Sequence, residues 1–217
     1  FEKKVVALAQ RVIFTFIQGF SHIERAYAPQ VKIMLHPEPQ KLFLTALNNF
    51  STANLRQIVV SYHTLLWLVT KENGYDVDDD DASQIISSID KLLESIRPKI
   101  IDSSSSNQSI VLGMAIIWQL CRRGFSKICI ERGMMTNILQ VAWLCSQQPC
   151  VAELPMAWCL GVVWAMLYES RGRREFAEHE NCDGLVVAVL RYFRAGPALS
   201  IFLKMCLIFL HKNPREK

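Results

Sequence analysis

The chain is 217 residues long, and 51% of its residues are apolar while 20% are charged. This composition is too apolar and too weakly charged for a disordered segment, and nine Gly and eight Pro exclude collagen-like and low-complexity chains. The 24 Lys and Arg against 20 Asp and Glu leave a net charge of +4, which is too mild to require a nucleic-acid partner. The length allows one globular domain or a small array of repeats.

Apolar residues recur at three- and four-residue spacing along the chain, which is the pattern of amphipathic helices. The first such stripes run Val5–Phe20, Ile58–Val69 and Ile85–Ile96. Pro98 is expected to end the third of these helices, because proline cannot donate to the helical ladder. Strict alternation is absent, and no Asn-Gly or Asp-Gly turn joins β-rich runs. The predicted fold class is therefore all-α.

Two polar stretches, near residues 71–82 and 102–109, are expected to be surface loops. The first contains five Asp between positions 76 and 81, and repulsion and solvation favour an exposed position for such a run. Its spacing does not suit calcium, because the sixth and twelfth positions counted from Asp76 are Asp81 and Ser87 rather than Gly and Glu. The second stretch, DSSSSNQS, is expected to cap a helix that begins near Ile110.

An internal repeat follows from apolar runs with a central aromatic residue. Trp67, Trp118, Trp164 and Phe209 stand at intervals of 51, 46 and 45 residues. A second helix is expected after each of the first three runs, over residues 82–96, 134–147 and 184–194. A period of about 40–47 residues with two or three helices per unit favours an α-solenoid. The three Trp are interpreted as core residues of the repeat.

Residues 126–139, SKICIERGMMTNIL, resemble the passage between the second and third helices of an armadillo repeat. In that family a short apolar helix, a Glu-x-Gly turn and a long third helix follow in this order. Residues 178–186 are a weaker copy, and the resemblance extends over about residues 55–210. It implies an armadillo-like right-handed superhelix of about four helical repeats, forming one domain over residues 1–217 that is expected to be excised from a longer protein. HEAT-type repeats are the alternative.

The resemblance also implies a concave groove lined by the third helices, which in armadillo proteins takes an extended peptide. A Trp and an Asn one turn apart often hold that peptide, and the nearest match is Trp143 with Gln147. Aligning the third helices puts Leu93 and Leu190 at the position of Trp143, so a repeated Trp–Asn ladder is not kept. The same alignment puts two Arg near Gln147, which favours an acidic ligand. The implied groove residues are Arg97, Asn137, Gln140, Trp143, Gln147, Arg191 and Arg194. The alternative interpretation is that Trp143 is core and the polar residues are solvated.

Positive charge is concentrated in the second half of the chain, where residues 109–217 carry a net +5 against −1 for residues 1–108. Two basic clusters each follow a Trp-containing helix, so stacking of repeats would bring them to one edge. This predicted basic edge consists of Arg122, Arg123, Lys127, Arg171, Arg173 and Arg174. Such a ridge suits phosphate or an acidic partner segment, and solvated turns are the alternative.

Sequence signatures of catalysis are missing, since the chain has no Gly-x-Ser-x-Gly, no phosphate loop and no Gly-x-Gly-x-x-Gly. His179 and Cys182 supply two of the four ligands that a structural zinc needs, so neither a metal nor a cofactor is expected. Seven Cys without a C-x-x-C pair favour free thiols in an intracellular compartment, cytoplasmic or nuclear. The longest uncharged apolar stretch, residues 154–168, is short of the roughly 20 residues that cross a bilayer, so no membrane partner is expected.

These observations predict a non-catalytic protein–protein interaction module, an adaptor or scaffold that binds a short peptide or helix of a partner in the concave groove. The alternative is binding of nucleic acid or an acidic partner through the basic edge, which a steep salt dependence would reveal. An enzyme built on a helical array ranks last, because the acidic run does not form a helical D-x-x-x-D pattern.

Overall fold

The structure is a computed structural model that describes Tyr62, Leu65, Leu66, Val69 and the ranges 77–97, 104–147, 152–193 and 196–212. In these residues the chain is helical and contains no strand, which confirms the predicted all-α class for this part. The stripe predicted over Val5–Phe20 lies outside the described residues, as do Trp67 and Arg194.

Helices of three lengths repeat in the same order along the described part of the chain. A long helix, a short helix and a helix of intermediate length follow in this order twice, as α6, α7, α8 and then as α9, α10, α11. A π-helical turn, η3, leads from α6 into α7. The bounds are α5 (Asp79–Ile96), α6 (Ser104–Leu120), η3 (Cys121–Phe125), α7 (Ser126–Glu131), α8 (Met134–Ser146), α9 (Glu153–Met166), α10 (Ser170–Glu178), α11 (Cys182–Tyr192) and α12 (Pro197–Lys212).

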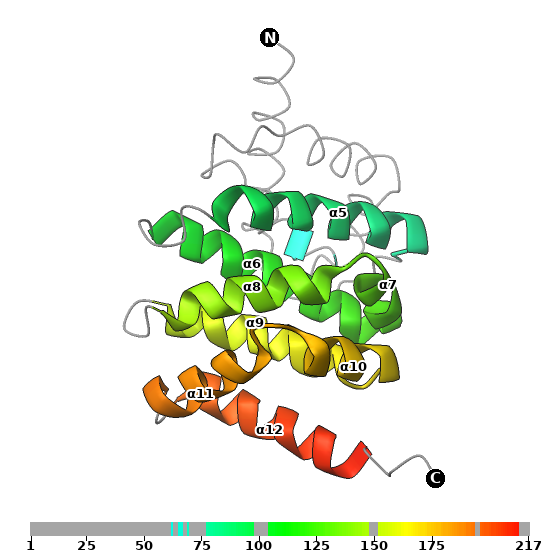
Figure 1. Ribbon diagram of the computed structural model, residues 1–217. Coiled ribbons are helices and arrows are strands. Elements are labelled where there is room, and N and C mark those ends of the chain that lie inside the picture. Colours follow the sequence, from blue (N-terminus) through cyan, green and yellow to red (C-terminus); the bar gives the residue numbers. More distant parts are fainter. Residues whose placement is uncertain are drawn as a thin grey trace, which may run out of the picture.

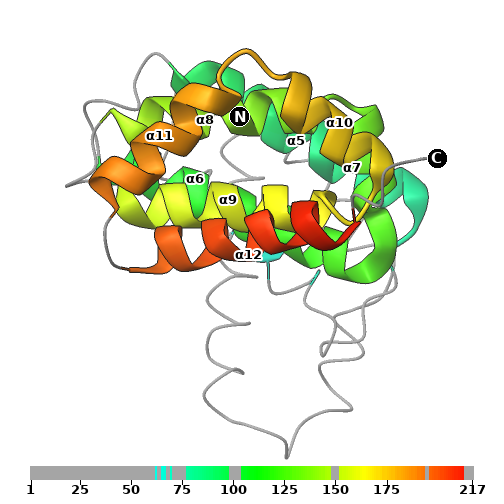
Figure 2. The same ribbon diagram turned by 60° about the horizontal axis from the view of Figure 1, so that its bottom comes forward.

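The long and intermediate helices form two layers (Figures 1 and 2). Helices α6, α9 and α12 lie side by side in one layer, and α5, α8 and α11 lie side by side in the other. The short helices α7 and α10 lie along the same side of the stack (Figure 1). Helix α9 packs against α6, α8 and α12, and its sequence is accordingly apolar on almost every side.

The core lies between the two layers, and the apolar stripes of the sequence point into it. The residues predicted for the stripe of α5 are buried, among them Ile85, Ile89 and Ile96. The same is true of the stripe of α8, which includes Ile138 and Cys145. Helical spacing therefore identified the buried faces of α5 and α8 correctly.

Helices α5 and α6 begin earlier than predicted, so the loops expected near 71–82 and 102–109 are wrong for part of their length. Helix α5 begins at Asp79 because the Asp78 side chain accepts a hydrogen bond from the Asp81 amide at 2.7 Å. The next three Asp occupy the first turn, where the helix dipole favours negative charge. Helix α6 begins at Ser104 and takes up most of the Ser-rich stretch.

We expect Asp78→Ala to lower the free energy of unfolding by about 1 kcal/mol, because the helix loses its N-cap. In a chain of this size the melting temperature should fall by about 2–4 °C in a thermal melt followed by circular dichroism. Asp80→Ala is the matched control, since it removes a first-turn charge without removing the cap. Equal losses for the two variants would show that the cap contributes nothing.

Two Gly with positive φ bound the short helix α7. Gly124 in η3 has φ 100° and Gly133 before α8 has φ 76°, and a side chain rarely adopts this region. Gly133 is the Gly of the Glu-x-Gly turn that carries the armadillo resemblance, and α8 starts directly after it, as predicted.

Candidate functional site

The layer of α5, α8 and α11 carries most of the residues that the sequence assigned to a groove, and a polar network lies at its centre. The Arg97 guanidinium donates a hydrogen bond to Asn137 Oδ1 at 2.8 Å, and Asn137 Nδ2 donates to Asp90 Oδ1. All three side chains are half-buried. The structure thus brings together two predicted groove residues and adds Asp90, which the sequence interpretation did not include.

Two buried polar atoms in this part of the layer have no hydrogen-bond partner among the described residues. They are Nε of Arg97, a donor, and Oε1 of Gln140, an acceptor. Gln140 follows Asn137 by three positions on α8, so the two residues lie on the same face of that helix. A buried polar atom left unpaired costs about 1–3 kcal/mol, and buried polar groups are normally paired. Both atoms are closed off from solvent, so a ligand would reach them only by displacing the side chains that cover them.

Trp143 lies at the boundary between α8 and α11. Its ring packs over Gly184, where a Cβ atom would come within 2.9 Å of Cζ3 and 3.1 Å of Cη2. The ring is half-buried, so it contributes to packing and remains partly accessible. Gln147 is exposed and its Nε2 donates to Ser146 Oγ at 3.1 Å, so this amide already has a partner inside the chain.

The expected equivalence of Leu93 with Trp143 is wrong. Leu93 is fully buried, whereas Leu190 is 53% exposed and Trp143 is half-buried. The buried positions of α5 match those of α8 when Leu93 is paired with Ala142, and a shift of one residue turns a helix by about 100°. On α11, Arg191 is exposed and its guanidinium carbon lies 5.5 Å from the centre of the Tyr192 ring.

The predicted basic edge is less open than the sequence suggested. Its two clusters lie on the side of the stack where α10 approaches α7, since a Cβ at Gly172 would lie 3.1 Å from Ile130 Cδ1. Arg123 donates to the Val69 carbonyl at 3.3 Å, and Arg173 donates to the Leu167 carbonyl at 3.0 Å. Arg171 forms an ion pair with Glu175 at 2.8 Å.

Three members of this edge are exposed and form no hydrogen bond or ion pair with another described residue. They are Arg122, Lys127 and Arg174. Half of the predicted cations therefore stabilise turns and helices of the chain itself.

The cysteines of the described part are free thiols, and burial suppresses the ionisation of Cys145 and Cys159. Cys121, Cys129, Cys145 and Cys159 are buried. Burial raises the pKa of the Cys145 thiol to about 12. The pKa of the Cys159 thiol is also raised, first by its burial and then by the neighbouring Cys145. Thiols of this kind are poor nucleophiles at neutral pH. Within the described ranges, no three His, Cys, Asp or Glu side chains gather closely enough to hold a metal ion.

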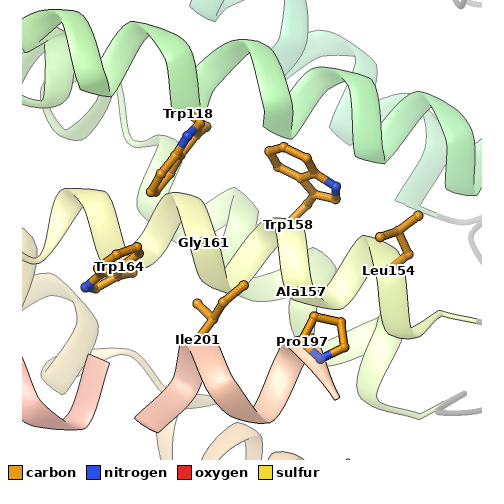
Figure 3. Close-up of a pocket in the computed structure, with 8 residues that line it drawn as sticks. All are labelled: Trp118, Leu154, Ala157, Trp158, Gly161, Trp164, Pro197 and Ile201. Carbon is orange, nitrogen blue, oxygen red and sulfur yellow. The ribbon is translucent and has the colours of Figure 1, made fainter. Parts of the chain in front are cut away.

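Sequence reasoning missed an apolar pocket in the layer of α6, α9 and α12. Trp118 reaches from α6, Trp158 and Trp164 come from α9, and together with residues of α12 they line a pocket of about 370 Å³ (Figure 3). Trp118 and Trp164 were interpreted as core, but both are half-buried and stack on each other with ring centres 5.6 Å apart. The sequence does carry one sign of this pocket. Along one apolar stripe of α9, the small residue Gly161 lies between Trp158 and Trp164.

No protein-family model, curated protein or solved structure matches the sequence. None of the described helices combines the length and the apolar character needed to span a bilayer.

Proposed function

We propose that the chain is a non-catalytic interaction module that binds an extended segment of a partner protein across α5, α8 and α11. The observation that supports this most directly is that Arg97 carries an unpaired buried donor and Gln140 of the neighbouring helix an unpaired buried acceptor. Each residue of an extended peptide offers one carbonyl acceptor and one amide donor, so a backbone that displaced the side chains covering these two atoms would satisfy both.

The composition of the surrounding face suits such a segment. Leu190 and Val187 of α11 are both more than half exposed, and Trp143 of α8 packs over Gly184, which precedes Val187 by one turn of α11. These side chains would receive the apolar side chains of the segment. The exposed guanidinium of Arg191 would favour an acidic group at the α11 end.

The architecture that we propose for this module is the armadillo-like superhelix. It is supported by the twofold succession of long, short and intermediate helices and by the Gly133 turn between α7 and α8. In such an array the third helices, α5, α8 and α11, line one continuous surface. The buried free thiols favour a site of action inside the cell.

Binding of nucleic acid or an acidic partner through the basic edge has weaker support. Arg123, Arg171 and Arg173 each have a partner inside the chain, which leaves three exposed cations for phosphate. A complex that depended on them would weaken steeply between 50 and 200 mM salt.

The test uses the 217-residue chain and a display library of random 12-residue peptides. We expect Gln140→Leu to weaken the selected peptides at least tenfold while leaving the melting temperature unchanged or higher, because an unpaired buried acceptor is replaced by an apolar group of similar size. Fluorescence anisotropy of labelled peptides and thermal melts provide the two readouts. Thr136→Ala, at an exposed position of the same helix, is the control and should change neither.

The proposal fails if the selected peptides bind Gln140→Leu as they bind the unaltered chain. It also fails if the selection yields only ligands that moderate salt releases and that Arg122→Glu abolishes. That second result would move the function to the basic edge.

A further inference from the structure

The outer face of α9, on the opposite layer from the proposed peptide site, leaves apolar surface uncovered. Leu154 at the start of α9 is 56% exposed, and Tyr168 just after its end is 51% exposed. Between them lie Trp158, Gly161 and Trp164, which line the apolar pocket (Figure 3). A continuous apolar stripe of this kind, open to solvent, is characteristic of an interaction site.

The shape of this stripe favours an elongated occupant. Leu154 and Trp164 are ten residues apart on α9, which corresponds to about 15 Å along the helix axis. The ring of Tyr168, whose centre is 6.4 Å from that of Trp164, continues the line beyond the pocket. Three turns of a helix span a similar length, about 16 Å, and the neighbouring helices α6 and α12 form the two walls of a trough.

Gly161 supplies the depth of the trough. A Cβ atom at this position would have Ile201 Cδ1 at 4.0 Å as its nearest neighbour, which is an ordinary van der Waals contact, so the space of the pocket reaches down to the α9 backbone here. A large apolar side chain of an occupant would enter this space between the Trp rings. This is the arrangement in which the apolar stripe of one helix docks in the groove of another protein.

Charge at the trough further restricts the occupant. The Lys204 ammonium of α12 lies 5.4 Å from the centre of the Trp164 ring, is exposed, and forms no ion pair with a described residue. Three Trp rings would otherwise suit a quaternary ammonium group, but a lysine already placed over one of them repels a cation. The same ammonium attracts a carboxylate on an occupant of the trough.

We propose that this trough, lined by Trp118, Trp158, Gly161, Trp164 and Ile201, binds an amphipathic helix of another protein. The apolar stripe of that helix fills the space over Gly161, and an acidic side chain near one of its ends pairs with Lys204. The site is separate from the proposed peptide site, because it lies on α6, α9 and α12 rather than on α5, α8 and α11. The chain would thus join two partners through its two layers.

The experiment displays a library of 16-residue amphipathic helices, randomised at apolar and flanking positions, to the 217-residue chain. We expect enrichment of helices with large apolar residues at i, i+3 or i+4 and i+7 and with Asp or Glu near one end. In fluorescence titrations, Gly161→Leu should weaken these helices at least tenfold, because leucine fills the trough. Lys204→Glu should weaken acidic helices about threefold or more and enrich helices with Lys in place of the acid.

Controls separate folding and the other surface from this effect. Gly161→Ala adds a single methyl group and should weaken binding without lowering the melting temperature. This variant provides the test if Gly161→Leu fails to fold. Lys127→Glu, an equal charge change on α7, should leave binding unchanged. Gln140→Leu should also leave it unchanged, so failure of the peptide site and failure of the trough are distinguishable.

The proposal is overturned if no helix is enriched, if enriched helices bind Gly161→Leu and Gly161→Ala as tightly as the unaltered chain, or if Lys204→Glu leaves the preference for acid intact. Binding of octanoate in the trough without binding of any helix would also overturn it and would assign the trough to small apolar carboxylates.

Discussion

Gly172→Ala is expected to lower the free energy of unfolding by about 3 kcal/mol, the upper part of the range for overpacked positions. Gly172 lies in the first turn of α10, where a Cβ atom would overlap the main-chain carbonyl of Met166 at the end of α9. Ile130 Cδ1 would stand only 3.1 Å away on another side. Because a backbone carbonyl cannot rotate away as a side chain can, α10 would have to move off α9. The hydrogen bond from Arg173 to the Leu167 carbonyl would be strained by that movement.

The matched control for this prediction is Gly161→Ala, which is the same chemical change in a helix interior. There the added methyl group would make only an ordinary van der Waals contact with Ile201 at 4.0 Å, so the higher helix propensity of alanine should raise the free energy of unfolding by about 0.5–1 kcal/mol. Urea denaturation followed by far-ultraviolet circular dichroism measures both variants. Opposite signs are expected, and a loss of less than about 1 kcal/mol for Gly172→Ala would refute the close contact between α10 and α9.

Helix periodicity was the part of the fold that the sequence predicted best. The stripe from Ile85 to Ile96 is buried as expected, and α5 ends before Pro98. Such patterns are local, because each depends only on residues three and four positions apart. The start of α5 was harder to place, since a run of Asp satisfies two opposite rules. Charge repulsion favours a loop, whereas an N-cap at Asp78 and the helix dipole favour a first turn, and here the helix prevails.

Contacts between distant segments were beyond what local patterns can predict. Asn137 is 40 residues from Arg97 and 47 from Asp90, and an alignment wrong by one residue was enough to misplace Leu93. The apolar character of Trp118 and Trp164 suggested core, because hydrophobicity does not tell whether a helix has a neighbour on its outer side. Only the packing of α6, α9 and α12 shows that one side of these rings remains open.

Asn137→Ala is expected to lower the free energy of unfolding by about 3 kcal/mol. Asn137 accepts from the guanidinium of Arg97 and donates to the carboxylate of Asp90, and hydrogen bonds to charged groups contribute about 1.5–3 kcal/mol each, with half-burial placing them at the lower end. These bonds also tie α5 to α8, which belong to successive units of the proposed array. Their loss should therefore weaken the contact between units as well as the unit that carries the substitution.

A double-mutant cycle separates this interaction from a general loss of packing. Asp90→Ala and Asn137→Ala, alone and combined, should show a coupling energy of about 1–2 kcal/mol in urea denaturation, because each variant removes the same hydrogen bond. Asp90→Ala combined with Thr136→Ala is the control pair and should be additive within about 0.5 kcal/mol, since Thr136 is exposed on α8. Additivity of the first pair would mean that the hydrogen bond between Asn137 and Asp90 contributes nothing to stability. In that case the bond from Arg97 to Asn137 would be the polar link between α5 and α8, as the packing of Trp143 over Gly184 links α8 to α11.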